Sequence, residues 1–219
     1  MSERRPQAVI FDLDGTLVDT VPARISAWRE TLTEAGIDVV DTHLEPMIGM
    51  GGRALATEVA RATGRGLDDA EAEDIDRLAG ERFDAHNQTP APLPGAREAL
   101  DRLDAAGITW AIATSSRAAQ VAASVASLAL PHAPRIVDGS QVVRAKPAPD
   151  LLLLAATELG VEPAATWYVG DSTWDMRAAE AAGMRPIAVL AGAAVGESAL
   201  RQAGATSVLA TLADLRLPD

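Results

Sequence analysis

The sequence predicts an α/β fold in which a parallel-sheet core carries an inserted all-helical segment. Three observations support this prediction. A short apolar run at Ala8–Phe11 is typical of a buried strand, and helical periodicity without strand signals follows over residues 22–90. Beyond residue 95, apolar runs alternate with helical stretches, which is the pattern of a parallel sheet covered on both faces.

The inserted segment begins with a helix near residue 22, whose apolar stripe contains Ile25, Trp28 and Leu32 and which ends at Gly36. Further helical periodicity covers residues 53–63 and 70–83. A proline-rich run at residues 89–95 then indicates a linker or hinge. We therefore expect two domains, an α/β core formed by residues 1–21 and 91–219 and a helical cap formed by residues 22–90.

In the rest of the core, helices are expected at residues 96–106, 117–130, 149–160 and 174–182. The strands expected beside them are residues 108–113, 166–169, 186–190 and 207–209. The run at Ala8–Phe11 cannot stand alone, so we expect it to join this sheet.

Composition excludes several classes of function. The chain has 219 residues, no cysteine and a formal net charge of −12 at pH 7. The absence of cysteine excludes disulfides and thiol catalysis. So acidic a surface repels nucleic acids and anionic membranes, and neither is expected as a partner. No apolar run approaches the ~18 residues of a membrane span. We expect a cytoplasmic protein, monomeric or homodimeric.

Polar side chains stand where three expected strands end. Asp12 and Asp14 follow the first strand, Thr114 and Ser115 follow residues 108–113, and Asp171 follows residues 166–169. In an open parallel sheet, ligands bind beyond the carboxyl ends of the strands. We therefore expect these side chains to converge on one point.

Converging carboxylates repel one another unless a cation lies between them. The set expected here is Asp12, Asp14, Asp171 and Asp175. Oxygen ligands completed by water suit Mg²⁺, which would also receive a phosphate oxygen. The basic residues are all arginine except Lys146, and this one ammonium is predicted to supply the remaining positive charge. The residues thus predict a phosphate site.

The same residues resemble the haloacid dehalogenase superfamily. Its conserved motifs are matched, in order along the chain, by Asp12-Leu13-Asp14-Gly15-Thr16-Leu17, Ala113-Thr114-Ser115-Ser116, Lys146-Pro147 and Gly170-Asp171-Ser172 with Asp175. This resemblance implies a Rossmann-like core, a mobile helical cap inserted after the first motif, and a Mg²⁺-dependent phosphatase acting through an aspartyl-phosphate.

The resemblance also implies a role for each matched residue. Asp12 resembles the nucleophile and Asp14 the general acid and base. Lys146 resembles the cation that holds Asp12 and the phosphoryl group. The Mg²⁺ ligands implied are Asp12, the Asp14 carbonyl and Asp171, with Asp175 acting through water or as an anchor. Phosphate or substrate contacts are expected from Gly15, Thr16, Thr114, Ser115 and Arg53.

Within the family, a phosphatase acting on a small phosphorylated metabolite is favoured. Asp14 disfavours dehalogenation, and a cap without lysine disfavours the Schiff-base phosphonate hydrolases. The loop at residues 48–53 resembles the specificity segment of phosphoglycolate-phosphatase-like members. A β-phosphoglucomutase-like sugar phosphomutase stays open as the alternative, and so does substrate contact by Arg24, Arg53 or Arg117. A non-enzymatic binding module is less favoured, because Asp12 and Asp14 are both present.

Overall fold

A six-stranded sheet forms the centre of the computed structural model, which describes residues 5–218. Every neighbouring pair of strands is parallel, and the order is β3-β2-β1-β4-β5-β6. The strands are β1 (Ala8–Phe11), β2 (Thr109–Ala113), β3 (Ile136–Val137), β4 (Thr166–Gly170), β5 (Arg185–Val189) and β6 (Ser207–Leu209). The chain reverses its direction of travel across the sheet between β3 and β4. The carboxyl ends of β1, β2 and β4 therefore surround a topological switch point.

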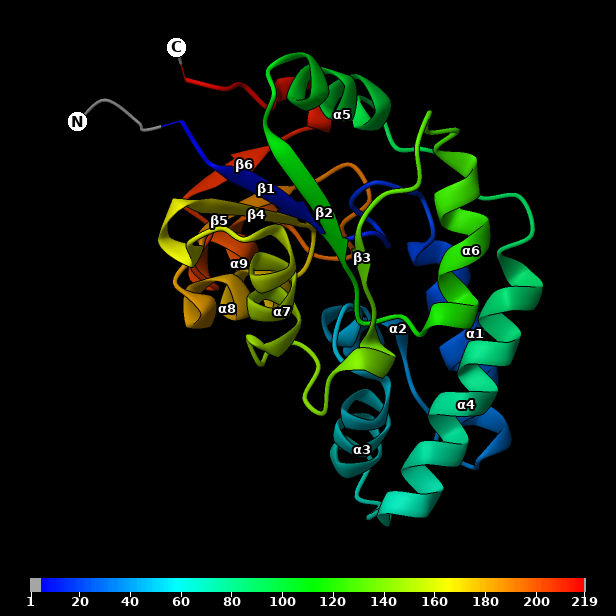
Figure 1. Cartoon of the computed structure of the whole chain (residues 1–219). Coiled ribbons are helices and arrows are strands. Elements are labelled where there is room, and N and C mark those ends of the chain that lie inside the picture. The colour runs from blue at the N-terminus through cyan, green and yellow to red at the C-terminus, as the bar shows by residue number, and fades with distance from the viewer. Residues whose placement is uncertain (1–4, 219) are drawn as a thin grey trace.

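Helices cover both faces of the sheet (Figure 1). On one face, α5 (Ala96–Ala105) and α6 (Ala118–Ser127) pack with Val9 and Phe11 of β1. On the other, α7 (Asp150–Leu159) and α8 (Thr173–Ala182) pack with Ile10 of β1, and α9 (Glu197–Gln202) packs beside α8. Alternate residues of β1 face opposite layers, which explains why this strand is apolar throughout.

Four helices lie between β1 and α5 in the chain and outside the sheet layers. They are α1 (Val21–Glu34), α2 (Asp41–Leu44), α3 (Gly52–Ala62) and α4 (Asp69–His86). Their apolar faces meet in a separate cluster that includes Trp28, Leu32, Leu55, Val59 and Ile75. We call these four helices the cap.

The two segments that join cap and core run side by side. Asp19 N donates to Ala91 O over 2.9 Å, and Leu93 N donates to Leu17 O over 2.9 Å. A bridge between Val18 and Pro92 lies between these bonds. Such paired links suit a hinge, and the division into residues 22–90 and the remainder stays a prediction. Residues 1–4 and 219, which that core includes, lie outside the described part of the chain.

The structure confirms the α/β class, the Rossmann-like sheet and the helical cap. The strand β3 was not predicted, because a pair of residues gives no periodicity to detect. The short helix α2 was also missed, because four residues show little helical periodicity. Over residues 5–218, no helix combines the length and the hydropathy that crossing a bilayer would need.

The packing predicts a contrast between two leucines. Leu100 of α5 is completely buried against the sheet, whereas Leu153 of α7 faces solvent. Leu100→Ala should lower the free energy of unfolding by about 2–5 kcal/mol, because a cavity adds to the lost transfer energy. Leu153→Ala is the matched control and should change it by about 0.5 kcal/mol or less. Urea denaturation measures both; equal losses would contradict the assigned core.

Candidate active site

Side chains from separate strand ends meet at the switch point of the sheet. Asp12 directly follows β1, Thr114 directly follows β2, and Asp171 directly follows β4. Between Asp12 and the cap, the chain turns at Gly15 with a φ of +79°. A Cβ at Gly15 would lie 2.3 Å from Asp171 Oδ2, so only glycine lets the backbone approach this carboxylate so closely.

The most buried cation of the site is Lys146, whose side chain is 1% exposed. Its Nζ lies 2.5 Å from Asp12 Oδ1 and 2.8 Å from Asp175 Oδ1. The ring of Tyr168 packs near the same ammonium, 5.4 Å from Nζ to the ring centroid. A compact ammonium suits this enclosed position between two carboxylates, where a guanidinium fork would not fit.

Asp175 holds Lys146 in place and is itself held on both oxygens. Oδ1 accepts from Lys146 Nζ and, over 3.0 Å, from the Tyr168 hydroxyl. Oδ2 accepts from Ser172 N over 3.0 Å and from Ser172 Oγ over 2.6 Å. With these donors in place, Asp175 serves as an anchor of the lysine more readily than as a direct metal ligand.

The carboxylates of this site fit a divalent cation. Oxygen atoms of Asp12, Asp171 and Asp175 lie within 4.8 Å of one another, and all three residues are buried. Asp171 accepts from Thr16 Oγ1 over 3.0 Å, and no other described residue donates to its side chain. Three buried carboxylates face one ammonium, so the cluster has an excess of negative charge. An oxygen-only donor set with that charge suits Mg²⁺.

Burial and mutual repulsion disturb the protonation of these groups. Burial, reinforced by Asp175 and Asp14 and opposed by Lys146, raises the pKa of Asp12 from 3.8 to about 7. Burial also raises the pKa of Asp171 well above its usual range, and Asp175 adds to the effect. For Lys146, burial alone would lower the pKa, but Asp12 and Asp175 outweigh it and the pKa rises. The ammonium is therefore permanent, while the carboxylates need a further positive charge.

Asp14 lies apart from this cluster and faces the cap. Its Oδ1 accepts from Thr20 Oγ1 over 2.7 Å, and its Oδ2 accepts from Arg24 Nη2 over 2.9 Å. Ser116 Oγ also donates to Oδ2. Its side chain is outside the group of described carboxylates that could share a metal, so only its backbone carbonyl is left for the metal contact expected from the sequence.

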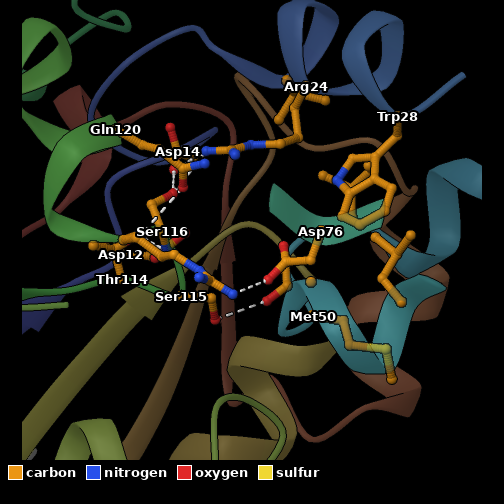
Figure 2. Close-up of a pocket in the computed structure, with 16 residues that line it drawn as sticks. Asp12, Asp14, Arg24, Trp28, Met50, Asp76, Thr114, Ser115, Ser116 and Gln120 are labelled. Carbon is orange, nitrogen blue, oxygen red and sulfur yellow. Dashed lines mark hydrogen bonds and ion pairs between the residues drawn. The ribbon is translucent and has the colours of Figure 1, made fainter. Parts of the chain in front are cut away.

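A cavity of about 60 Å³ lies between the core residues and the cap. Asp12, Asp14 and Thr114 form its core side, and Arg24 reaches toward Asp14 from the cap side (Figure 2). The cap also contributes an apolar wall, made of Val21, Trp28, Ile48, Met50 and Leu55. One wall can thus hold a charged phosphoryl group while the other contacts an organic group.

The remaining residues expected at the site fall into two groups. Thr114 and Ser115 line the cavity. Ser115 Oγ also donates a hydrogen bond over 3.3 Å to the carbonyl oxygen of Gly49, which precedes α3. Thr16 is fully buried behind Asp171 and does not line the cavity. Arg53 is half exposed, lies outside the cavity and pairs with Glu73 over 3.4 Å.

Arg117 spans from core to cap. It donates to Glu73 over 2.8 Å and to Asp76 over 2.5 Å, both on α4. Burial raises the pKa of Asp76, an effect that Arg117 partly offsets. The arginine lines the cavity, and both contacts use its Nη2, so its charge is already shared between two cap carboxylates. The contact therefore stabilises the closed arrangement of cap and core seen here.

Sequence reasoning missed several residues that shape the site. Ser116 is a partner of Asp14, Tyr168 is a partner of Asp175, and Asp76 is the cap partner of Arg117. Ser116 stood inside a recognised motif, which was a usable signal. Tyr168 resembled any other apolar strand residue, and only the three-dimensional position of its hydroxyl shows its role.

The family follows from a comparison with known sequences. Residues 9–189 match the family model described as haloacid dehalogenase-like hydrolase, which spans most of the chain. The chain belongs to this family. The relatives named below are phosphatases, and the chain is an enzyme of that kind.

Two relatives and one solved structure illustrate the similarity. The chain is 35% identical over 202 residues to a phosphoglycolate phosphatase of Xanthomonas campestris pv. campestris, covering 89% of this chain and 87% of the relative. It is 31% identical over 192 residues to an N-acetylmuramic acid 6-phosphate phosphatase of Pseudomonas aeruginosa, covering 86% and 84%. A hydrolase from Pseudomonas syringae superposes with a TM-score of 0.90 at 32% identity, covering 95% of both chains.

The raised pKa of Asp12 predicts how stability depends on pH without divalent cations. Folding favours protonated Asp12, so its contribution is complete below about pH 4 and is lost as the pH rises through about 7. Asparagine cannot ionise. The melting temperature of Asp12→Asn should therefore rise relative to the wild type between pH 4 and pH 7.

Calorimetry in EDTA measures this difference. Asp69→Asn, which alters an exposed carboxylate of α4, is the control and should show no such trend. Mg²⁺ should stabilise the wild type more than Asp12→Asn at pH 7. If the melting temperatures of Asp12→Asn and the wild type differ by the same amount from pH 4 to pH 7, the electrostatic description of the site is contradicted.

Proposed function

We propose that this protein is a Mg²⁺-dependent phosphomonoester hydrolase that acts on a small phosphorylated metabolite through an aspartyl-phosphate. One observation carries the proposal: the buried Lys146 lies 2.5 Å from Asp12, at a cavity that also contains the second carboxyl group, Asp14. The names of the relatives, phosphoglycolate phosphatase and N-acetylmuramic acid 6-phosphate phosphatase, support the same reaction class.

In the first step, an oxygen of Asp12 attacks the phosphorus atom. Lys146 engages Oδ1, and no described residue donates to Oδ2, which is therefore the oxygen available for attack. A bond forms between Oδ2 and phosphorus while the ester P–O bond breaks. Asp14 gives its proton to the departing oxygen, so that a neutral alcohol leaves.

In the second step, water attacks the phosphorus of the aspartyl-phosphate. Asp14, now ionised, removes a proton from this water. The bond between Asp12 and phosphorus breaks, inorganic phosphate leaves, and both carboxyl groups return to their starting states. Arg24, Thr20 and Ser116 hold Asp14 in one orientation during both proton transfers.

Mg²⁺ bound by Asp12, Asp171 and the Asp14 carbonyl would neutralise negative charge on the phosphoryl oxygens. The chain supplies the remainder. Lys146 places a fixed positive charge beside Asp12, and the Thr114 hydroxyl and the amides that follow β2 offer donors to the phosphoryl group. The cap encloses the cavity and limits the access of water before the ester bond breaks.

The phosphomutase alternative is retained only as an outcome of the test. Similar folds include β-phosphoglucomutases at 24% and 20% identity, which show the fold alone. A mutase must hold a second phosphate, yet Arg53 and Arg117 already pair with cap carboxylates here.

The expectations of a cytoplasmic enzyme, monomeric or dimeric and without nucleic-acid or membrane partners, remain proposals that rest on composition.

Phosphate release from a panel of metabolite esters tests the proposal. Release should need Mg²⁺ and disappear in EDTA and in Asp12→Asn. Asp14→Asn should lose about 10²–10⁴-fold with alkyl phosphates, because they need a protonated leaving group. The loss should be smaller with p-nitrophenyl phosphate, whose leaving group needs no proton. Asp69→Asn is again the control. Full activity of Asp12→Asn, or interconversion of glucose 1- and 6-phosphates without release, would overturn the proposal.

The enclosed position of Lys146 predicts that charge alone is insufficient there. Lys146→Arg keeps the charge but should lower kcat by about 100-fold or more, since a fork cannot replace a point charge between Asp12 and Asp175. The matched control is Arg144→Lys, which makes the reverse exchange at an exposed pair with Asp150. Steady-state kinetics on the best ester measures both. Near-normal kcat in Lys146→Arg would show that the lysine is incidental.

A further inference from the structure

Arg24 lines the cavity, and some of its N–H groups have no acceptor within the described part of the protein. Its Nη2 donates to Asp14 Oδ2 over 2.9 Å and to Ser116 Oγ over 2.7 Å. Among residues 5–218, none accepts a hydrogen bond from its Nε or Nη1. The side chain is nevertheless only 14% exposed. No buried side-chain nitrogen of the described residues lacks a partner, so Nε and Nη1 keep some exposure and can meet a ligand in the cavity that Arg24 lines.

The guanidinium of Arg24 is fixed in orientation. Its Cζ lies 3.5 Å above the ring centroid of Phe83, a fully buried residue of α4. The stack occupies one face of the guanidinium plane, while Asp14 and Ser116 fix one nitrogen of its edge. Nε and Nη1 are left, and each can donate a charge-assisted hydrogen bond to one oxygen of a carboxylate.

We propose that Arg24 recognises a carboxylate on the leaving group, so that the preferred substrates are phosphate esters of small hydroxy acids. This inference rests on the proposed function, because it identifies Asp14, the partner of Arg24, as the group that protonates the leaving oxygen. Arg24 is then a specificity-determining residue that contacts the part of the substrate released as the alcohol.

The distances limit where that carboxylate can be. Arg24 Nη2 is 2.9 Å from Asp14 Oδ2, and a proton transfer needs Asp14 about 2.7 Å from the ester oxygen. The ester oxygen therefore lies within about 5.6 Å of the guanidinium during the reaction. A carboxylate attached one or two carbons from that oxygen falls within reach of the guanidinium, whereas a more distant one would have to fold back.

The size and charge of the cavity favour the same class of substrate. Its 60 Å³ would hold about four to six water molecules, which is room for a leaving group of few atoms. The charged groups that line it are Asp12, Asp14, Asp76, Arg24 and Arg117. Arg117 is paired with Asp76, and Lys146 is paired with Asp12. Arg24 pairs with one carboxylate, Asp14, whereas Arg117 shares its charge between two, so Arg24 is the lining arginine better able to attract a further anion.

A ratio of specificity constants tests the inference. The probes are 2-phosphoglycolate and ethyl phosphate, which differ by a carboxylate in place of a methyl group. In the wild type, kcat/KM for 2-phosphoglycolate should exceed that for ethyl phosphate by about 10- to 100-fold. Arg24→Gln keeps a donor for Asp14 and Ser116 but removes the charge, and the ratio should fall toward one.

A matched control separates recognition from a general change of charge. Arg77→Gln removes one cap arginine that is exposed and pairs with Asp74 and Glu81, and it should leave the ratio unchanged. Arg24→Met is a second variant in case Arg24→Gln is unstable, and circular dichroism verifies that each variant is folded. The inference is supported if the ratio of the two kcat/KM values falls toward one in a folded Arg24 variant and stays unchanged in Arg77→Gln.

Other outcomes overturn the inference in distinguishable ways. If both esters lose activity by the same factor in the Arg24 variants, the arginine only positions Asp14. If the wild type hydrolyses both esters equally well, the carboxylate is not recognised, although the phosphatase itself stands. If the wild type hydrolyses neither these esters nor p-nitrophenyl phosphate with Mg²⁺, the proposed function fails, and this inference with it.

Discussion

The buried ammonium of Lys146, held between Asp12 and Asp175, is the interaction on which the rest of the site depends. Removing a charge from water costs several kcal/mol unless partners with good geometry replace the water. Two carboxylates provide that geometry here, and the Tyr168 hydroxyl and Ser172 hold the outer carboxylate in turn. Because each partner fixes the next, Asp12 at the end of β1 has one position relative to the sheet.

The same arrangement leaves an unbalanced charge, which ties the chemistry to a metal and to the cap. Lys146 cannot neutralise Asp12, Asp171 and Asp175 together, and burial, with this repulsion added to it, raises the pKa values of Asp12 and Asp171. A divalent cation would supply the missing charge. Electrostatic stabilisation is also strongest where water is excluded, so a cavity closed by the cap strengthens every interaction within it.

The fold and the catalytic cluster were largely predictable because they follow from chain topology. Parallel strands end at one edge, so Asp12, Thr114 and Asp171 had to approach each other wherever the intervening helices lay. The orientation of cap side chains was not predictable in the same way. Arg53 pairs with Glu73 and lines a neighbouring pocket with Ser115 and Lys146, and its contact with substrate stays a prediction. Its direction depends on how α3 is rotated against α4, and no local pattern encodes that rotation.

Arg24 shows how the two parts of the chain divide the reaction between them. In the proposed reaction, Asp12 and Lys146 of the core act on the phosphoryl group and would serve any ester equally well. Arg24 lies near the start of α1, a short segment after Asp14 in the chain, and it donates to this carboxylate directly. A change at this one position can alter which alcohol is released and leave the cluster around Lys146 untouched. Asp14 accepts hydrogen bonds from Arg24 of the cap and from Ser116 of the core. In the proposed reaction, this carboxylate therefore links the recognition of the leaving group to the phosphoryl transfer.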